Sequence, residues 1–186
     1  NIYDFDKTIY DGDSSIDFYK YCLSKNKKCL LIIPNTLIQF VLYKCGIVSK
    51  EKFKSRFFSF IKYFDNIESE AELFWNINLK KIKKFYLENR KTTDYIISAS
   101  PEFLLKPISK KLNFNLIATD IDLKTGLLKG KNCYGIEKLK RLEEHGINEC
   151  NEFYSDSKSD MPLRKIAKKG YIVKKNEIIL WNINEL

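Results

Sequence analysis

Three clusters of polar residues in the sequence could take part in chemistry, and each follows a short apolar run. They are Asp4-Phe5-Asp6-Lys7-Thr8, Ser98-Ala99-Ser100 and Asp156-Ser157-Lys158-Ser159-Asp160. Side chains two positions apart on a strand point the same way, so Asp4 and Asp6 are predicted to face one site. Two carboxylates that lie close together repel each other unless a proton or a cation lies between them. We predict Mg²⁺ as that cation, with Asp156 and Asp160 as further ligands, because Mg²⁺ prefers oxygen ligands and is commonly bound together with phosphate.

These residue types suit the transfer of a phosphoryl group. One carboxylate could attack phosphorus to form an acyl phosphate, while a second one protonates the leaving alcohol and then activates water. The hydroxyl and amide groups of Ser98 and Ala99, before a predicted helix, would donate to phosphate oxygens. A lysine should balance the remaining charge, and Lys138 is preferred over the alternative, Lys131. The chain has a single histidine, which favours carboxylates for the acid–base steps.

An alternation of strands and helices is predicted to position the three clusters. Strands are expected near residues 1–5, 95–97, 116–118, 153–154, 171–173 and 178–180. Helices are expected over residues 102–112, capped by Ser100, 135–144 and 161–169, with a hairpin over 120–130. This order predicts an α/β fold with a parallel sheet. In such sheets the ligand crevice lies at the carboxyl ends of the strands, so the three clusters should meet there.

A helical block separates the first strand from the rest of the sheet. Helices are expected over residues 14–22, 30–43, 50–62 and 68–88. The block is too long for one crossover connection. We therefore predict a helical cap domain at 13–90, inserted into a core formed by 1–12 and 91–186. The apolar stretch 29–48 contains Pro34, Asn35, Gln39 and Lys44, which favours one or two buried or interfacial helices over a membrane span.

The motifs resemble those of the haloacid-dehalogenase-like phosphatases, in particular the phosphoserine-phosphatase-like branch (subfamily IB), which has a helical cap after the first motif. They read DFDKTIYDGD, SASPEFLLKPI, GKNCYGIEKLKRL and YSDSKSDMPL, and the resemblance covers nearly the whole chain. It implies a Rossmann-like core, Mg²⁺, Asp4 as the phosphorylated nucleophile and Asp6 as the acid/base, with the Asp6 carbonyl also on the metal. The roles that it further implies are phosphate binding by Thr8, Ser98 and Lys138, and metal binding by Asp156 and Asp160.

The resemblance also suggests substrates. In phosphoserine phosphatases an acid after the first motif and a cap arginine hold the amino acid, and Asp13 and Arg56 are the candidates for these roles. A small soluble phosphorylated metabolite, of which a phosphoserine-like compound is one example, is therefore the first substrate hypothesis. The cap is rich in apolar and aromatic residues with flanking lysines, as in relatives that act on lipid headgroups, such as phosphatidylglycerophosphate phosphatases. A lipid phosphate at a membrane surface is the alternative.

Composition limits the remaining classes of function. The chain has 186 residues, of which 44% are hydrophobic and 31% charged, values that exclude a disordered chain and a membrane-filling one. It has 33 Lys and Arg against 24 Asp and Glu, a net charge of +9. Because the lysines are scattered, they indicate a solvated surface, and nucleic acid is not the favoured partner. A non-catalytic module that binds nucleic acid or phosphate is the third hypothesis.

The cysteines and the start of the chain bear on the compartment. The sequence has five cysteines at irregular spacing and no Cys-x-x-Cys motif, so a disulfide framework is not expected. The chain opens without the basic and apolar regions of a signal peptide. Both features predict a cytoplasmic protein.

Overall fold

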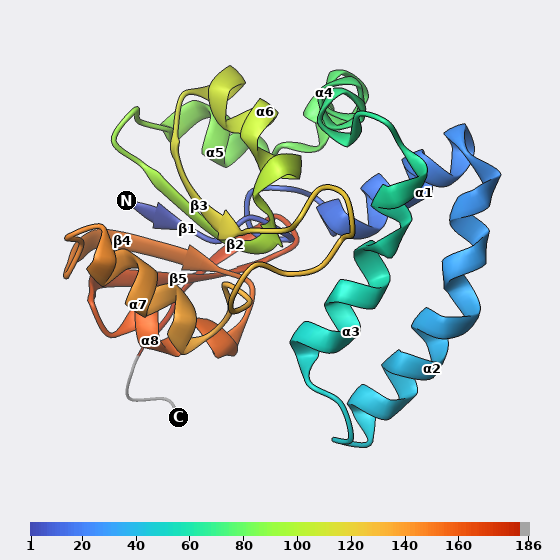
Figure 1. The fold of residues 1–186 in the computed structure, drawn as a ribbon. Coiled ribbons are helices and arrows are strands. Elements are labelled where there is room, and N and C mark those ends of the chain that lie inside the picture. The colour runs from blue at the N-terminus through green and yellow to red at the C-terminus, as the bar shows by residue number, and fades with distance from the viewer. Residues whose placement is uncertain (183–186) are drawn as a thin grey trace.

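A six-stranded sheet with helices on both faces forms the centre of the molecule (Figure 1). The computed structural model describes residues 1–182, and the strand order is β3-β2-β1-β4-β5-β6. The strands are β1 (Ile2–Tyr3), β2 (Tyr95–Pro101), β3 (Asn115–Thr119), β4 (Cys150–Ser155), β5 (Ala167–Lys174) and β6 (Glu177–Leu180). The first five are parallel, and β6 pairs antiparallel with β5. The predicted α/β fold with a mostly parallel sheet is confirmed.

The short strand β1 lies at the point where the strand order changes direction. Tyr3 pairs with Ile96 of β2 on one side and with Tyr154 of β4 on the other. The backbone amide of the next residue, Asp4, still donates to the carbonyl of Tyr154 at 2.8 Å. A crevice opens at such a switch point in α/β sheets, so Asp4 stands where a ligand is expected.

Side chains alternate along the strands and divide the core into two layers. On one face, Tyr3 contacts Tyr86 of α5 (Lys84–Asn89) and stacks on Tyr154, with ring centroids 4.7 Å apart. Helix α6 (Glu102–Leu112) covers the same face. On the other face, Ile2 and Phe153 pack in a cluster with α7 (Ile136–Glu144) and α8 (Met161–Arg164). Figure 1 shows these helices on the two sides of the sheet.

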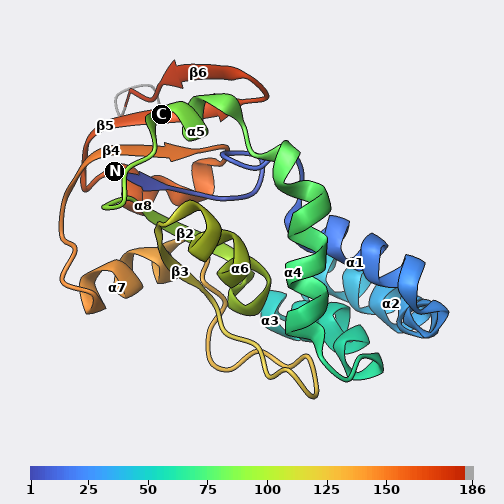
Figure 2. The ribbon, with the colours of Figure 1, turned by 90° about the horizontal axis from the view of Figure 1, so that it is seen from above.

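The helical block joins the sheet through a continuous apolar core. Its helices are α1 (Ser14–Lys25), α2 (Ile33–Lys44), α3 (Lys50–Phe57), α4 (Ile67–Asn78) and α5, with 3-10 turns at Lys27–Ile32, Phe58–Tyr63 and Leu79–Lys81. Phe5, directly after β1, lies edge-on against Trp75 of α4, and Phe74 of α4 contacts Phe18 of α1. Figure 2 shows α4 between α6 and the helices α1 and α2. The apolar packing therefore continues without a break across the boundary that the sequence predicts between the core and the helical cap.

Two expected helices are shorter in the structure. The helix expected over 68–88 is interrupted between α4 and α5, because Ile82 pairs with Tyr10 and the amide of Lys83 donates to the carbonyl of Ile9. The helix expected over 161–169 ends at Arg164, and β5 begins three residues later. Gly170, expected to end that helix, lies within β5, where a Cβ atom would come within 2.0 Å of the Arg164 side chain.

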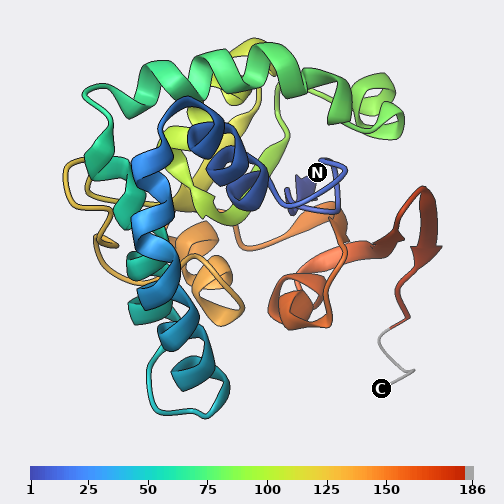
Figure 3. The same ribbon diagram turned by 90° about the vertical axis from the view of Figure 1, so that its right-hand side faces the viewer.

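Helix α2 occupies much of the apolar stretch 29–48, and none of its residues is buried. Of the two alternatives expected for this stretch, the buried one is therefore wrong for α2, and the interfacial one stays a prediction. Within residues 1–182, no helix combines the length and the apolar character that crossing a membrane requires. Helices α2 and α3 run side by side and extend away from the sheet (Figures 1 and 3).

The hairpin expected over 120–130 is present and contacts the helical block. Ile121 pairs with Leu128, and the amide of Leu128 donates to Ser55 Oγ of α3 at 3.2 Å. Gly126 lies at its tip with a φ of +76°, and a Cβ atom there would lie 2.2 Å from the carbonyl oxygen of Phe58. Glycine at this position lets the hairpin approach the backbone after α3.

Replacing Gly126 with alanine should destabilise the protein more than the same change at Gly130. Both residues have a positive φ, but a Cβ atom at Gly130 would meet nothing within 4 Å. Because only Gly126→Ala forces a backbone clash, we expect it to lower the free energy of unfolding by about 1–3 kcal/mol more than Gly130→Ala. Denaturant titration of both variants measures the difference. Equal losses would show that the close approach to Phe58 does not contribute.

Candidate active site

A cavity of about 500 Å³ lies between the carboxyl ends of β1, β2 and β4 and the helices α2 and α3. Its lining includes, from the sheet side, Asp4, Asp6, Ser98, Ala99, Lys138, Asp156 and Asp160, and, from the cap side, Phe40, Lys50, Phe53, Lys54, Phe57 and Phe58. The three polar clusters of the sequence therefore lie around one cavity, although they are distant in the chain.

A buried lysine joins two of the predicted acids. The ammonium of Lys138, in the first turn of α7, donates to Asp4 Oδ1 at 2.7 Å and to Asp160 Oδ2 at 2.8 Å. Ser155 Oγ also donates to Asp160 Oδ2, at 2.8 Å. Lys138 and Asp160 are each 2% exposed, and Asp4 is 8% exposed. Lys131, the alternative phosphate lysine, is exposed and is not part of the cavity lining.

Burial and neighbouring charges shift the ionisation of this group. Burial raises the pKa of Asp4 to about 7, with Lys138 opposing the rise and Asp160 adding to it. Burial alone would lower the pKa of Lys138, but the two carboxylates raise it, so the ammonium keeps its proton. The site therefore holds one fixed positive charge between two buried carboxylates, and the buried Asp4 is costly to ionise without it.

Asp6 is held by hydrogen bonds at the start of α1. Its Oδ1 accepts from the amide of Ser14 at 2.7 Å, and its Oδ2 accepts from Ser100 Oγ at 2.5 Å. Burial, reinforced by the nearby charge of Asp13, raises the pKa of Asp6 to about 6. A carboxyl group with such a pKa can both give and take a proton near neutral pH.

Two local expectations about these motifs need correction. Strand β1 ends at Tyr3, so Asp4 and Asp6 do not share a face by strand alternation, and the chain turns at Lys7, which has a φ of +59°. Both carboxylates nevertheless line the cavity. Ser100 does not cap α6, whose N-cap position is Pro101 without a side-chain hydrogen bond. The hydroxyl of Ser100 instead donates to Asp6.

Other predicted site residues lie in different positions. Thr8 is fully buried, its Oγ1 is 3.5 Å from Asp4 Oδ2, and it is not part of the cavity lining. Asp13 lines the cavity, while its carboxylate accepts from the amide of Ile16 and caps α1. Arg56 is exposed and lies outside the lining. The structure thus brings Asp13, but not Arg56, to the cavity.

Two lysines of α3 were missed by the sequence reasoning. Lys54 donates to the carbonyl of Ala99 and, at 2.7 Å, to Asn132 Oδ1, and burial lowers its pKa to about 8. The ammonium of Lys50 lies 3.0 Å from the ring centroid of Tyr134. Their spacing of four residues, which places both on one face of a helix, was the available signal.

The oxygen atoms around Lys138 fit a hard divalent cation. Asp160 Oδ1 is buried and has no hydrogen-bond partner among the described residues. Asp156 lines the same cavity, and burial raises its pKa. Carboxylate oxygens that lack hydrogen-bond partners are the ligands that Mg²⁺ prefers. In the part of the chain that the structure describes, no three acidic, histidine or cysteine side chains form a ready metal-binding group, and Lys138 lies between Asp4 and Asp160.

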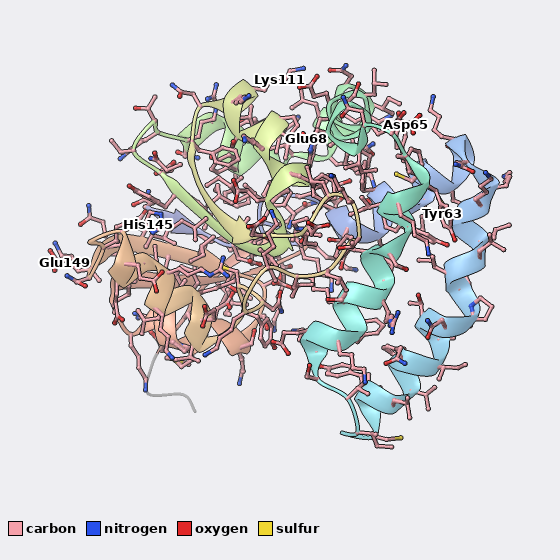
Figure 4. The ribbon with its side chains drawn as sticks, viewed as in Figure 1. Tyr63, Asp65, Glu68, Lys111, His145 and Glu149 are labelled. Atoms are coloured by element: carbon pink, nitrogen blue, oxygen red, sulfur yellow. The ribbon has the colours of Figure 1, made fainter. Side chains whose placement is uncertain are left out.

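The single histidine lies away from this cavity. His145 is the C-cap residue of α7, is exposed, and lies on the side of the molecule opposite α2 and α3 (Figure 4). Acid–base chemistry in the cavity therefore falls to its carboxyl and amino groups, as the sequence indicates.

Comparisons with known proteins agree with this architecture. A family model described as haloacid dehalogenase-like hydrolase matches residues 2–165. A Bordetella pertussis protein of unknown function is similar in structure, with a TM-score of 0.73, 18% identity, and coverage of 91% of this chain and 86% of that chain. A phosphoserine phosphohydrolase-like protein from Francisella tularensis has a TM-score of 0.57 and 19% identity, with 91% and 84% covered. No curated protein sequence shows a significant match.

A third similar structure is a HAD family hydrolase from Salmonella enterica serovar Typhi. It has a TM-score of 0.60 and 12% identity, and the match covers 89% of this chain and 59% of that chain. At such identities the three likenesses establish a shared fold.

Replacing Lys138 with methionine should strongly destabilise the protein. The variant leaves Asp4 and Asp160 buried without their shared cation, so we expect a loss of about 3–5 kcal/mol near neutral pH. The loss should shrink as the pH falls, because the buried Asp4 of the folded variant then holds a proton more readily than Asp4 of the unfolded chain does. Denaturant titration at several pH values measures both effects. Lys140→Met, at an exposed position of the same helix, is the control and should change stability by less than about 0.5 kcal/mol; similar losses in both variants would contradict the assignment.

Proposed function

Because the chain belongs to the haloacid dehalogenase-like hydrolases, we propose that it is a phosphatase that hydrolyses phosphomonoesters through an aspartyl-phosphate on Asp4. The main support is the position of Asp4, which follows the central strand, lines the cavity and has one carboxylate oxygen bound to Lys138. Its other oxygen, Oδ2, has Thr8 Oγ1 as its neighbour at 3.5 Å and is the freer of the two. That oxygen is the proposed nucleophile.

The proposed reaction has two steps that share the same proton carrier. In the first, Asp4 Oδ2 forms a bond to phosphorus while the ester oxygen leaves and takes a proton from Asp6. In the second, Asp6 takes a proton from water, whose oxygen attacks phosphorus and releases inorganic phosphate and the Asp4 carboxylate. The pKa of about 6 for Asp6 suits a group that must alternate between the two forms.

The phosphate oxygens need donors and positive charge around them. We propose that Ser98 and the amide of Ala99, both in the C-terminal half of β2, donate to them, with the N-terminus of α6 ahead, whose dipole also favours an anion. Lys138 supplies a fixed charge that neutralises the developing negative charge. Lys54 donates to the carbonyl of Ala99 and so helps to fix the orientation of this part of β2.

Mg²⁺ is the proposed cofactor. Asp4, Asp156, Asp160 and the carbonyl of Asp6 are the groups that would hold it. When bound, the ion would neutralise phosphate charge and reduce repulsion between the phosphate and the carboxylates. The buried Asp160 Oδ1, which has no hydrogen-bond partner among residues 1–182, supports this assignment.

The residues that line the cavity from α2 and α3 indicate which substrates would fit it. A small phosphorylated metabolite is the first candidate, and Lys50 and Lys54, rather than Arg56, would meet an anionic group on it. A phosphoserine-like substrate also needs an acid for its ammonium group, and Asp13 at the cavity could serve. A phosphate carried by a lipid headgroup is the second candidate, because Phe40, Phe53, Phe57 and Phe58 give the cavity an aromatic wall.

Replacing Asp4 with asparagine tests the nucleophile. The amide keeps the size of the side chain and can still accept from Lys138, but it cannot form the acyl phosphate. Release of nitrophenol from p-nitrophenyl phosphate in the presence of Mg²⁺ should fall at least about 10³-fold, with the fold intact by circular dichroism. Asp65→Asn, at an exposed position before α4, is the control and should retain full activity. Substantial turnover by the Asp4 variant would remove this residue from its role.

Replacing Asp156 with alanine tests the metal assignment. The variant should need about 10-fold or more Mg²⁺ for half-maximal activity. It should also lose most of the increase in melting temperature that Mg²⁺ gives the unaltered protein, since binding to the folded state stabilises it. Glu149→Ala, which removes an exposed carboxylate at the far side of the sheet (Figure 4), should leave both titrations unchanged. If the Asp156 variant also responds normally, Asp156 is not a metal ligand.

A further inference from the structure

Helix α2 turns its apolar side chains outward. Leu37, Ile38 and Val41 are 60%, 58% and 58% exposed, and their spacing places them on one side of the helix. Leu31 before the helix and Ile47 after it extend this patch. Figure 3 shows α2 on the outside of the molecule. The residues Leu31, Leu37, Ile38, Phe40, Val41 and Ile47 are called the α2 surface below.

Two polar side chains of α2, those of Thr36 and Gln39, face the protein, whereas Asn35 and Lys44 are exposed. Thr36 Oγ1 and Gln39 Oε1 are both shielded from solvent, and neither has a hydrogen-bond partner among the described residues. A helix that borders water normally turns its polar groups to the solvent and its apolar groups to the protein. The exposed apolar residues of α2 and its shielded Thr36 and Gln39 oxygen atoms show the reverse arrangement, which is expected where the outer medium is apolar.

The charge around the α2 surface selects the partner. Residues 26–50 contain Lys27, Lys28, Lys44 and Lys50 and not one Asp or Glu. The ammonium of Lys44 lies 5.6 Å from the ring centroid of Phe40, so its stem runs along the apolar surface. Apolar residues flanked by lysines are the pattern of a helix at an anionic lipid surface. Two copies of this chain joined through the α2 surface would bring these lysines together, which opposes such a dimer.

The α2 surface continues into the candidate active site. Phe40 belongs to both, being 42% exposed and part of the cavity lining. Its ring contacts that of Phe53, which also lines the cavity, with centroids 5.6 Å apart. The 12-residue helix is about 18 Å long, which suits a position along a bilayer surface.

We propose that the α2 surface docks on the surface of an anionic lipid bilayer, with α2 lying in the plane of the interface. Docking places the aromatic wall of the cavity next to the lipid headgroups. The consequence that phosphate esters in the bilayer surface reach Asp4 rests on the proposed function, whereas the docking itself does not.

Flotation of the full chain with vesicles tests the docking. The protein should float with vesicles of phosphatidylcholine and phosphatidylglycerol, and much less with phosphatidylcholine alone. The double variant Leu37→Gln/Val41→Gln should bind the anionic vesicles at least about 10-fold more weakly. The matched control is Leu73→Gln/Ile77→Gln, which changes two exposed apolar residues at the same spacing on α4. Because α4 carries Glu68, Glu70 and Glu72, this control should bind like the unaltered protein.

Several outcomes would overturn the proposal. Sedimentation that shows a dimer of the unaltered protein, dissociated by Leu37→Gln/Val41→Gln, together with no flotation identifies a second copy of the chain as the occupant of the α2 surface. Equal loss of binding in both double variants, or equal binding to both vesicle types, removes the α2 surface from membrane contact. Hydrolysis of p-nitrophenyl phosphate, measured in parallel, separates the two claims. Activity without flotation rejects the docking and keeps the phosphatase proposal. Flotation without activity keeps the docking and rejects the phosphatase proposal.

Discussion

The arrangement of the site depends on one buried set of charges, the ammonium of Lys138 shared by the carboxylates of Asp4 and Asp160. These residues come from the end of β1, the first turn of α7 and the turn after β4. Burying any one of the charges alone is strongly unfavourable, so each is tolerated only while its partners are in place. The pairing of β1 with β4 and the packing of α7 are thus coupled to the formation of the cavity.

The sequence could predict the place of the three polar clusters because two simple properties determine it. Apolar runs mark the strands, and the carboxyl ends of neighbouring parallel strands meet at one edge of a sheet. Helix α6 spans Glu102–Leu112, as its pattern indicates. Prediction failed where the backbone pairs with a distant segment, as at Ile82 and Lys83, which bind Tyr10 and Ile9 instead of continuing a helix.

The cap side of the cavity was harder to predict, because tertiary packing alone decides it. Lys54 binds Ala99 and Asn132, which lie 45 and 78 residues away in the chain. Its spacing from Lys50 shows that the two lysines share a helix face, but lysines on a helix usually face solvent. The packing of α3 turns this face to the cavity and leaves Arg56, two residues after Lys54, in solvent.

Helix α2 shows why an apolar pattern predicts a helix without predicting which side is outside. A helix that packs mainly against one neighbour buries only one side, and α2 contacts α3 through Phe40 and Tyr43, whose rings both lie against Phe53. Turning α2 by half a rotation would shield Leu37 and Val41 and would expose Thr36 and Gln39 to water. It would also remove Phe40 from the cavity wall and break both ring contacts. The exposed apolar face is therefore tied to the shape of the cavity.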